Sequence, residues 1–316
     1  MKSNFEFLNR YWPALAQIGA AAESYVYSDA NACLYKLGMF GERLILEIFA
    51  FEHIKEPTID NTHANRIRLL KREGLIPKKI DDILYALRKT RNDAVHAGAD
   101  SVEDAKTLLS MTYNLAVWFM EVYGDWGYIA PAFVMPENVV QPDYESIIKE
   151  QEEKIVALSK QVEAVSTAAS TKTSKERAEK GETASESMEL SEAETRYLID
   201  EQLRKFGWEA DTNTLRYSKG TRPQKGRNLA IAEWPTDSAV GKNGYADYAL
   251  FVGVKLVGIV EAKKAAIDIP SVIDHQCKEY AKGIKDEHQE YTINQWGAYK
   301  VPFVFATNGR KYLKQI

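Results

Sequence analysis

The most constraining feature of this sequence is a pair of apolar runs that carries charged residues near its ends. Residues 244 to 264 read G-Y-A-D-Y-A-L-F-V-G-V-K-L-V-G-I-V-E-A-K-K. Runs this rich in β-branched and aromatic residues are typical of buried strands, here joined by a turn near Gly253. A charge in such a strand loses its hydration unless a metal ion or an opposite charge compensates for it. Asp247, Glu261 and Lys263 therefore need a chemical explanation.

The spacing of these charges predicts that they meet in one site. Glu261 and Lys263 are two residues apart, so in a strand both side chains leave the same face while Ala262 points to the other. If the two runs pair as a hairpin, Asp247 lies beside Glu261. Two neighbouring carboxylates repel one another, and a hard divalent cation such as Mg²⁺ removes that repulsion. Such an ion polarises a phosphoryl oxygen and activates a bound water, which a lysine can orient.

Length and composition bound the class of protein. A chain of 316 residues with 45% hydrophobic and 27% charged residues is expected to be globular and soluble, with room for two domains. The formal net charge of -4 means that any nucleic-acid contact must come from a local basic patch. Cys33 and Cys277 have no metal-ligand or disulfide spacing, and no signal segment or membrane-length apolar run occurs. We expect a cytoplasmic protein without a membrane contact.

Hydrophobic periodicity divides the chain into three parts. Residues 1–135 are expected to form an all-α domain, with apolar stripes at helical spacing over 30–54, 80–96 and 102–123. Residues 136–189 are expected to be a helical stem with a short heptad run, followed by a flexible linker over 166–187, which lacks large apolar residues. Residues 190–316 are expected to be an α/β domain that opens with a helix capped by Ser191 and Glu194. A basic loop, the strand pair, a helix announced by Asp268 and Pro270, and a buried strand in V-P-F-V-F-A-T follow.

The charged triad occurs in the pattern D-x(13)-E-A-K, which resembles the core of the PD-(D/E)xK nucleases. Ala246 stands where the name of that pattern has a proline. Other segments resemble the N-terminal region of the R (restriction) subunit of type I restriction-modification enzymes. These segments are E-T-R-Y-L-I-D, L-R-Y-S-K-G-T-R-P, A-I-A-E-W-P, Q-x-x-x-Y and F-A-T-N-G-R. The likeness covers residues 190–316, and the opening K-S-N-F-E-F-L and the segment A-V-W-F extend it to nearly the whole chain.

This resemblance implies a Mg²⁺-dependent DNA endonuclease domain of the restriction-endonuclease-like fold, with a central mixed sheet and with Mn²⁺ as a substitute metal. It implies metal ligands at Asp247, Glu261 and the Ala262 carbonyl, with Glu194 near the metal, and catalytic roles for Asp247, Glu261, Lys263, Gln276 and Tyr280. Glu194 has a second reading as a helix cap alone, and Gln276 and Tyr280 as ordinary helix surface. A solvated hairpin edge with a chance ion pair is the plain alternative for the triad.

The same resemblance implies partners that this chain does not contain. In that family the nuclease is fused to an ATP-dependent DNA-translocating motor, acts on double-stranded DNA and assembles with modification and specificity subunits. No G-x-x-x-x-G-K-[ST] loop occurs here, so ATP is expected only for the motor domains, and we expect a fragment or truncated product. A glycine-bearing basic run without acidic residues suits a DNA backbone, although it also fits a solvated loop: Arg216, Lys219, Arg222, Lys225 and Arg227.

Two rival functions remain open at this point. The segment R-K-T-R-N-D-A-V-H, residues 88–96, resembles the R-x(4-6)-H motif of HEPN-type ribonucleases, in which Arg91, Asn92 and His96 would act by acid-base chemistry. Arginine and histidine about a turn apart on a helix are common by chance, which favours an adaptor or subunit-docking role for this domain. The other rival is a non-catalytic docking or DNA-binding fragment whose nuclease fold is inert.

Overall fold

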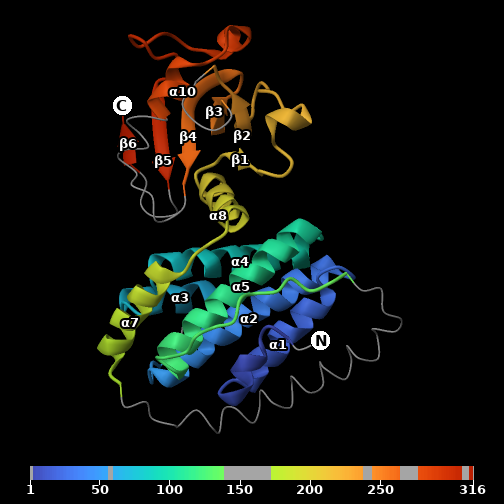
Figure 1. The fold of residues 1–316 in the computed structure, drawn as a ribbon, viewed down its shortest axis with the longest axis vertical. Helices are drawn as coiled ribbons and strands as arrows, with labels where there is room; N and C mark the ends of the chain where they lie inside the picture. Colours follow the sequence, from blue (N-terminus) through green and yellow to red (C-terminus); the bar gives the residue numbers. More distant parts are fainter. Residues whose placement is uncertain are drawn as a thin grey trace. The chain divides into compact units, whose positions relative to one another are not determined.

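The structure, a computed structural model, describes residues 3–55, 60–138, 172–237, 244–263 and 277–307, and the backbone of 313–315. The chain forms two compact units, Met1–Met188 and Glu189–Ile316 (Figure 1). The expected fold class is confirmed, since a helical unit precedes a unit built on a mixed sheet. Within the described ranges, no helix is both long and apolar enough to cross a membrane.

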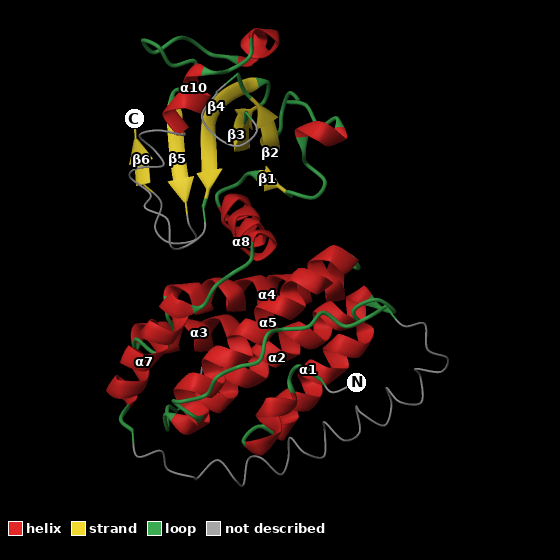
Figure 2. Cartoon of the chain, viewed as in Figure 1, coloured by secondary structure: helices red, strands yellow, loops and turns green. Residues whose placement is uncertain are grey.

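The first unit is a bundle of helices, coloured red in Figure 2. Its elements are η1 (Glu6–Arg10), α1 (Pro13–Tyr25), α2 (Ala30–Phe51), α3 (His63–Arg72), α4 (Lys78–Ala97), α5 (Val102–Phe119), the π-helical turn η2 (Met120–Gly124) and α7 (Ser174–Ser187). The helix α2 packs against α1, α4 and α5, and Leu37, Phe40 and Leu44 on its apolar stripe are fully buried. The three helices expected from periodicity are therefore confirmed as α2, α4 and α5, with ends that differ by a few residues.

The interpretation of residues 166–187 as a flexible linker is wrong for the part that forms α7. This helix has no large apolar residue of its own, but polar contacts bind it to the other helices. The Trp118 indole donates to the carbonyl of Gly181 at 2.9 Å, and Lys79 donates to the carbonyl of Met188 at 2.8 Å. Arg177 forms an ion pair with Glu52 at the end of α2. The rest of that stretch and the heptad run before it lie outside the described residues.

The second unit is a mixed sheet, shown in yellow in Figure 2. Its strands are β1 (Glu209–Ala210), β2 (Asn228–Pro235), β3 (Tyr245–Val252), β4 (Lys255–Ala262), β5 (Phe303–Thr307) and β6 (Leu313–Gln315), adjacent in that order. β1 and β2 are parallel, as are β4 and β5, and the other neighbours are antiparallel. The sheet is accompanied by α8 (Glu192–Lys205), α10 (Lys278–Lys282) and the short helices η3 (Tyr217–Lys219) and η5 (Asp286–Tyr291).

Both faces of this sheet are covered by helices, because apolar residues alternate through β3 and β4. Ala249 and Ile259 pack in one cluster with Tyr280 of α10. Tyr248 and Val260, their neighbours along the strands, pack in a second cluster with Ile199 of α8. Adjacent strand residues face opposite sides, so α8 and α10 cover opposite faces. The start of the helix expected near Asp268 and Pro270 lies outside the described residues.

Candidate active site

The β3–β4 hairpin brings the two predicted carboxylates together. The register pairs Tyr248 with Val260 and Ala249 with Ile259, and Gly253 supplies the left-handed turn residue with φ 60°. One step further along the same antiparallel ladder, Asp247 and Glu261 stand at neighbouring positions. The hairpin predicted from the sequence is therefore confirmed.

Hydrogen bonds tie both carboxylates to the end of β4. Asp247 accepts a hydrogen bond from the backbone N–H of Ala262 through Oδ2 at 2.7 Å, and one from Arg196 Nη2 through Oδ1 at 3.1 Å. The Lys263 ammonium donates to Glu261 Oε1. Lys263 and Glu261 thus meet as their two-residue spacing predicts, and Ala262 packs with the cluster on the α8 side. One aspartate, one glutamate and one lysine converge where β3 begins and β4 ends.

Burial makes both carboxylates hard to ionise, and the charge of Asp247 adds to this effect at Glu261. Burial raises the pKa of Glu261 to about 7, and the negative charge of Asp247 acts in the same direction, against the opposing effect of Lys263. Burial also raises the pKa of Asp247, although the Ala262 N–H, Arg196 and Lys263 oppose the shift. Two buried acids whose charged forms are disfavoured gain from any cation that binds between them.

The donor set at this site fits a hard divalent cation. Glu261 is 3% exposed, and its Oε2 is buried without a hydrogen-bond partner among the described residues. A buried oxygen without a donor is costly, and a metal ion would satisfy it. No group of three His, Cys, Asp or Glu side chains in the described part of the chain is placed to hold a metal. Two carboxylates still suit Mg²⁺, which commonly keeps several waters and takes oxygens from its substrate.

The structure uses Glu194 as a helix cap. Its Oε2 accepts from the backbone N–H of Ser191 at 2.7 Å, and Ser191 Oγ accepts from the Glu194 N–H at 3.2 Å. This reciprocal pair is the capping box that the sequence predicts. The structure does not group Glu194 with Asp247 and Glu261 as a metal site.

Of the two residues expected to brace the site, Tyr280 is described and Gln276 lies outside the described residues. Tyr280 on α10 is buried, and burial together with the charges of Glu261 and Asp247 raises the pKa of its hydroxyl. The same carboxylates and burial raise the pKa of Cys277 to about 12, and its Sγ donates to the carbonyl of Phe305 at 3.3 Å. Tyr280 therefore stays protonated on the sheet face that carries the carboxylates.

Two charged residues near the site were not singled out from the sequence. Arg196 of α8 lies 3.1 Å from Asp247, and its guanidinium also lies 3.2 Å from Glu192 and 3.8 Å from Glu233. Glu233 of β2 has φ 52°, a left-handed backbone that non-glycine residues rarely adopt. The i, i+4 spacing of Glu192 and Arg196 was a local signal of their pairing. No local signal linked Arg196 or Glu233 to Asp247.

The predicted DNA-binding run is only partly free to meet a phosphate. Arg216 lies 3.2 Å from Glu233 and Arg227 Nε lies 3.0 Å from Glu209, so both guanidinium groups have acidic partners. Arg222 is stacked 3.7 Å from the centre of the Tyr217 ring. Lys219 and Lys225 are exposed. Arg216 is linked to the surroundings of Asp247 through Glu233, which also lies near Arg196.

The rival site in the helical unit is not assembled as a cluster. The Arg91 guanidinium forms an ion pair with Glu42 and lies 5.4 Å from the centre of the Tyr35 ring. Asn92 and His96 are exposed on the same helix, α4. Among the described contacts, none joins Arg91 to His96. The Arg91 side chain therefore contacts residues of α2.

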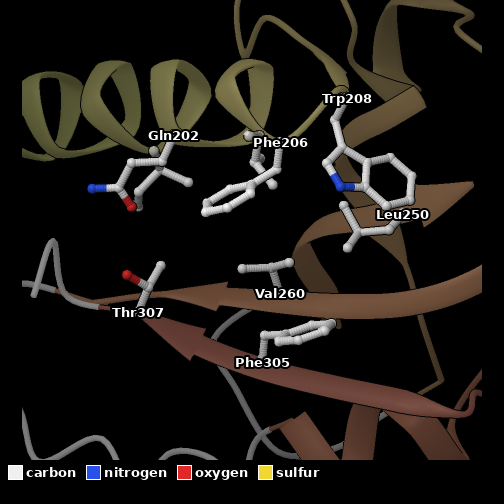
Figure 3. Close-up of a pocket in the computed structure, with 9 residues that line it drawn as sticks. Gln202, Phe206, Trp208, Leu250, Val260, Phe305 and Thr307 are labelled. Atoms are coloured by element: carbon white, nitrogen blue, oxygen red, sulfur yellow. The ribbon is translucent and has the colours of Figure 1, made fainter. Parts of the chain in front are cut away.

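An apolar pocket of about 230 Å³ lies between α8 and the sheet (Figure 3). Its wall consists of Ile199, Gln202, Leu203, Phe206, Trp208, Leu250, Val260, Phe305 and Thr307. Figure 3 shows Gln202 on α8, and Phe206 just after the end of this helix, above Val260, Phe305 and Thr307 on the strands. The pocket opens on the α8 face, whereas Glu261 belongs to the α10 face. It is consequently separate from the carboxylate site.

Comparisons with known proteins support the resemblance. Residues 209–316 match the family described as the second domain of the type I restriction enzyme EcoKI endonuclease subunit, and residues 20–164 match a domain of unknown function (DUF4145). The endonuclease subunit of the type I restriction enzyme EcoKI from Escherichia coli (strain K12) is 31% identical over 98% of this chain. The matched region is 33% of that relative, so the chain spans about a third of its length. No solved structure gives a significant match.

The family match covers the strands that carry Asp247, Glu261 and Lys263, and the curated relative extends the similarity through the helical unit. Both agree with the motifs from which the resemblance was inferred. The chain corresponds to the N-terminal region of the R subunit of type I restriction-modification enzymes.

Proposed function

We propose that this chain carries the Mg²⁺-dependent DNA endonuclease module of a type I restriction enzyme. The observation that supports this most strongly is the meeting of Asp247, Glu261 and Lys263 at the end of the β3–β4 hairpin, with one buried Glu261 oxygen left without a partner. The reaction is phosphodiester hydrolysis in double-stranded DNA. Its site belongs to the PD-(D/E)xK class.

The residues of the chain would divide the work of hydrolysis as follows. Asp247 and Glu261 hold the cation, with the Ala262 carbonyl as a further ligand. Bound there, Mg²⁺ supplies Lewis-acid activation of the phosphoryl group and of a water. The Ala262 N–H fixes the Asp247 carboxylate at 2.7 Å. Lys263, held beside Glu261, orients the attacking water and offsets charge that develops on the phosphate.

DNA would approach along the basic run next to the sheet. Lys219 and Lys225 are exposed and supply positive charge for phosphates, while Arg216 lies close to the site through Glu233. Tyr280 would brace the site from the α10 face, and Gln276 is proposed to act with it. Modification and specificity subunits would complete the assembly in the cytoplasm, and ATP would be used by motor domains, since these 316 residues have no phosphate-binding loop.

Metal binding tests this proposal most directly, because it does not require a motor to feed DNA to the site. Mn²⁺, as a stand-in for Mg²⁺, is titrated calorimetrically into the wild-type chain, Asp247→Ala and Glu261→Gln. Glu209→Gln is the matched control, since Glu209 is a carboxylate of the same unit that is paired with Arg227 and half exposed. We expect binding by the wild type and Glu209→Gln, and its loss in both site variants. Equal binding by the wild type and Asp247→Ala would refute the assignment.

Metal dependence also separates this function from its rivals. A HEPN-type ribonuclease cleaves RNA without a metal, so RNA cleavage that persists in EDTA and disappears in His96→Ala would favour the helical unit instead. An inert nuclease fold that serves only in docking would bind neither Mn²⁺ nor Mg²⁺. The two carboxylates and the lysine, all in contact with their expected neighbours, favour the nuclease.

A further inference from the structure

One guanidinium is shared among three carboxylates beside the candidate metal site. Arg196 Nη2 lies 3.1 Å from Asp247 Oδ1 and 3.2 Å from Glu192 Oε1. Its Nη1 lies 3.8 Å from Glu233 Oε1, which is an ion-pair distance but too long for a hydrogen bond. That Nη1 is buried and has no hydrogen-bond partner among the described residues. Arg196 therefore holds Asp247 while one of its own donors is left unsatisfied.

The backbone of β2 keeps Glu233 next to this unsatisfied donor. The ladder pairs Ala232 with Tyr248 and Trp234 with Ala246, so Glu233 stands at the position across from Asp247. Its φ of 52° is in the left-handed region, where a side chain is strained. Strain of this kind persists only where surrounding contacts enforce it, and it is found preferentially at functional sites. The Glu233 carboxylate lies next to Nη1 of Arg196, whereas Asp247 accepts from Nη2.

The charge of Arg196 competes with a divalent cation for the same carboxylate. Arginine cannot lose its proton in a protein, so the guanidinium carries its charge at any working pH. It donates to Asp247 Oδ1, an oxygen of the carboxylate proposed to hold the metal. A metal ion and a guanidinium next to one carboxylate repel each other, and a nearby second acceptor relieves that repulsion.

We propose that Arg196 is a positioning residue that neutralises Asp247 in the metal-free protein, and that Glu233 receives its guanidinium when a divalent cation takes Asp247. This inference rests on the proposed metal site at Asp247 and Glu261. It adds two residues that regulate occupation of that site, one opposing the metal and one favouring it. In the metal-free protein, Arg196 prevents the repulsion between two buried carboxylates from opening the strand ends.

The two residues are expected to shift metal affinity in opposite directions. Arg196→Gln removes the competing charge, so the Kd for Mn²⁺ should fall roughly tenfold, within the usual range of coupling between sites. Glu233→Gln removes the negative charge beside Nη1 and leaves Glu192, which is 74% exposed, as the other anionic partner of Arg196, so the Kd should rise by a similar factor. Arg196→Lys keeps the positive charge but loses the planar guanidinium that donates to several acceptors at once. The Kd of this variant for Mn²⁺ should lie between those of Arg196→Gln and the wild type.

The matched control is Arg204→Gln on the same helix. Arg204 is also ion-paired, with Glu201, and one of its nitrogens is also buried without a partner, but it lies away from Asp247. Its Kd for Mn²⁺ should stay within about twofold of the wild type, as for a distant independent position. Thermal unfolding in EDTA and in saturating Mn²⁺ confirms that each variant folds. It should also show a larger metal-induced rise in Tm for Arg196→Gln than for the wild type.

The outcomes separate this inference from the function on which it rests. If the wild type binds Mn²⁺ and Arg196→Gln binds equally or more weakly, Arg196 only supports the fold and the inference is overturned, while the metal site stands. An unchanged Kd for Mn²⁺ in Glu233→Gln would show that Glu233 does not receive the Arg196 guanidinium when the cation binds. A wild type that binds no Mn²⁺ would overturn the metal site and the inference together.

Discussion

The ion pair between Arg177 and Glu52 fastens α7 to the end of α2. Arg177 Nε lies 2.6 Å from Glu52 Oε1 and Arg177 Nη2 lies 2.6 Å from Oε2, so the pair is bidentate. Only 6% of the Arg177 side chain and 1% of the Glu52 side chain are exposed. The guanidinium also lies 4.9 Å from the centre of the Phe51 ring. Removing the arginine alone leaves a buried carboxylate without a counter-charge.

Arg177→Met is therefore expected to lower the free energy of unfolding of the helical unit by about 3–5 kcal/mol at pH 7. Burial raises the pKa of Glu52, but hydrogen bonds from Arg177 and Ser174 outweigh it and lower the pKa below its usual 4.5. A carboxyl with a lowered pKa in the folded state stabilises above its unfolded pKa, and this stability is lost as pH falls through the folded value. The loss of stability caused by Arg177→Met should thus be smaller below pH 4.5. At pH 7, the double variant Arg177→Met/Glu52→Gln should recover most of the stability that Arg177→Met loses.

Urea denaturation followed by tryptophan fluorescence measures this cost. Trp118 reports on the interface itself, because its indole donates to the carbonyl of Gly181 in α7. Arg72→Met is the control, since Arg72 is 74% exposed and its pair with Glu73 at 3.4 Å should contribute less than about 1 kcal/mol. A loss below about 1 kcal/mol for Arg177→Met at pH 7, or no recovery when Glu52→Gln is added, would show that the buried pair does not hold α7.

Three further predictions concern other parts of the chain. Lys263→Ala should reduce DNA cleavage by about 100-fold or more while the Kd for Mn²⁺ changes little, measured by plasmid nicking and calorimetry; equal losses of both would make Lys263 a structural residue. Burial raises the pKa of Asp200 from 3.8 to about 6. The stability that Asp200 contributes to the folded sheet unit is therefore fully present below pH 3.8 and is lost as pH rises through about 6. Between those values the sheet unit should lose up to about 3 kcal/mol of stability, which urea titrations of the wild type and Asp200→Asn would detect. In α2, a Cβ at Gly38 would lie 2.3 Å from Arg91 Cβ, whereas one at Gly41 would lie 3.4 Å from Leu87 Cδ1. Gly38→Ala should therefore cost about 1–3 kcal/mol, and Gly41→Ala should be neutral or stabilise by up to about 1 kcal/mol, as judged by thermal unfolding.

Local patterns predicted those parts of the fold whose stability comes from their own residues. The stripe of α2, the capping box of α8 and the apolar runs of β3 and β4 each contain a complete signal within one segment. The strand β2 was missed because its apolar core, Leu229 to Ala232, is short and follows a basic loop that resembles a continuous coil. The helix α7 was misjudged because contacts from Trp118, Lys79 and Glu52, distant in sequence, hold it in place.

The same distinction explains what could be predicted of the site. Asp247, Glu261 and Lys263 lie on one hairpin, so strand alternation and a short turn were enough to bring them together. Arg196 reaches Asp247 from a helix 51 residues earlier, and Glu233 reaches Arg196 through a backbone conformation that no sequence pattern signals. A nuclease motif consists only of residues that would contact the metal and the phosphate. The charges that hold those residues in the absence of metal become apparent only when the elements are packed, and at this site they set how readily a cation can enter.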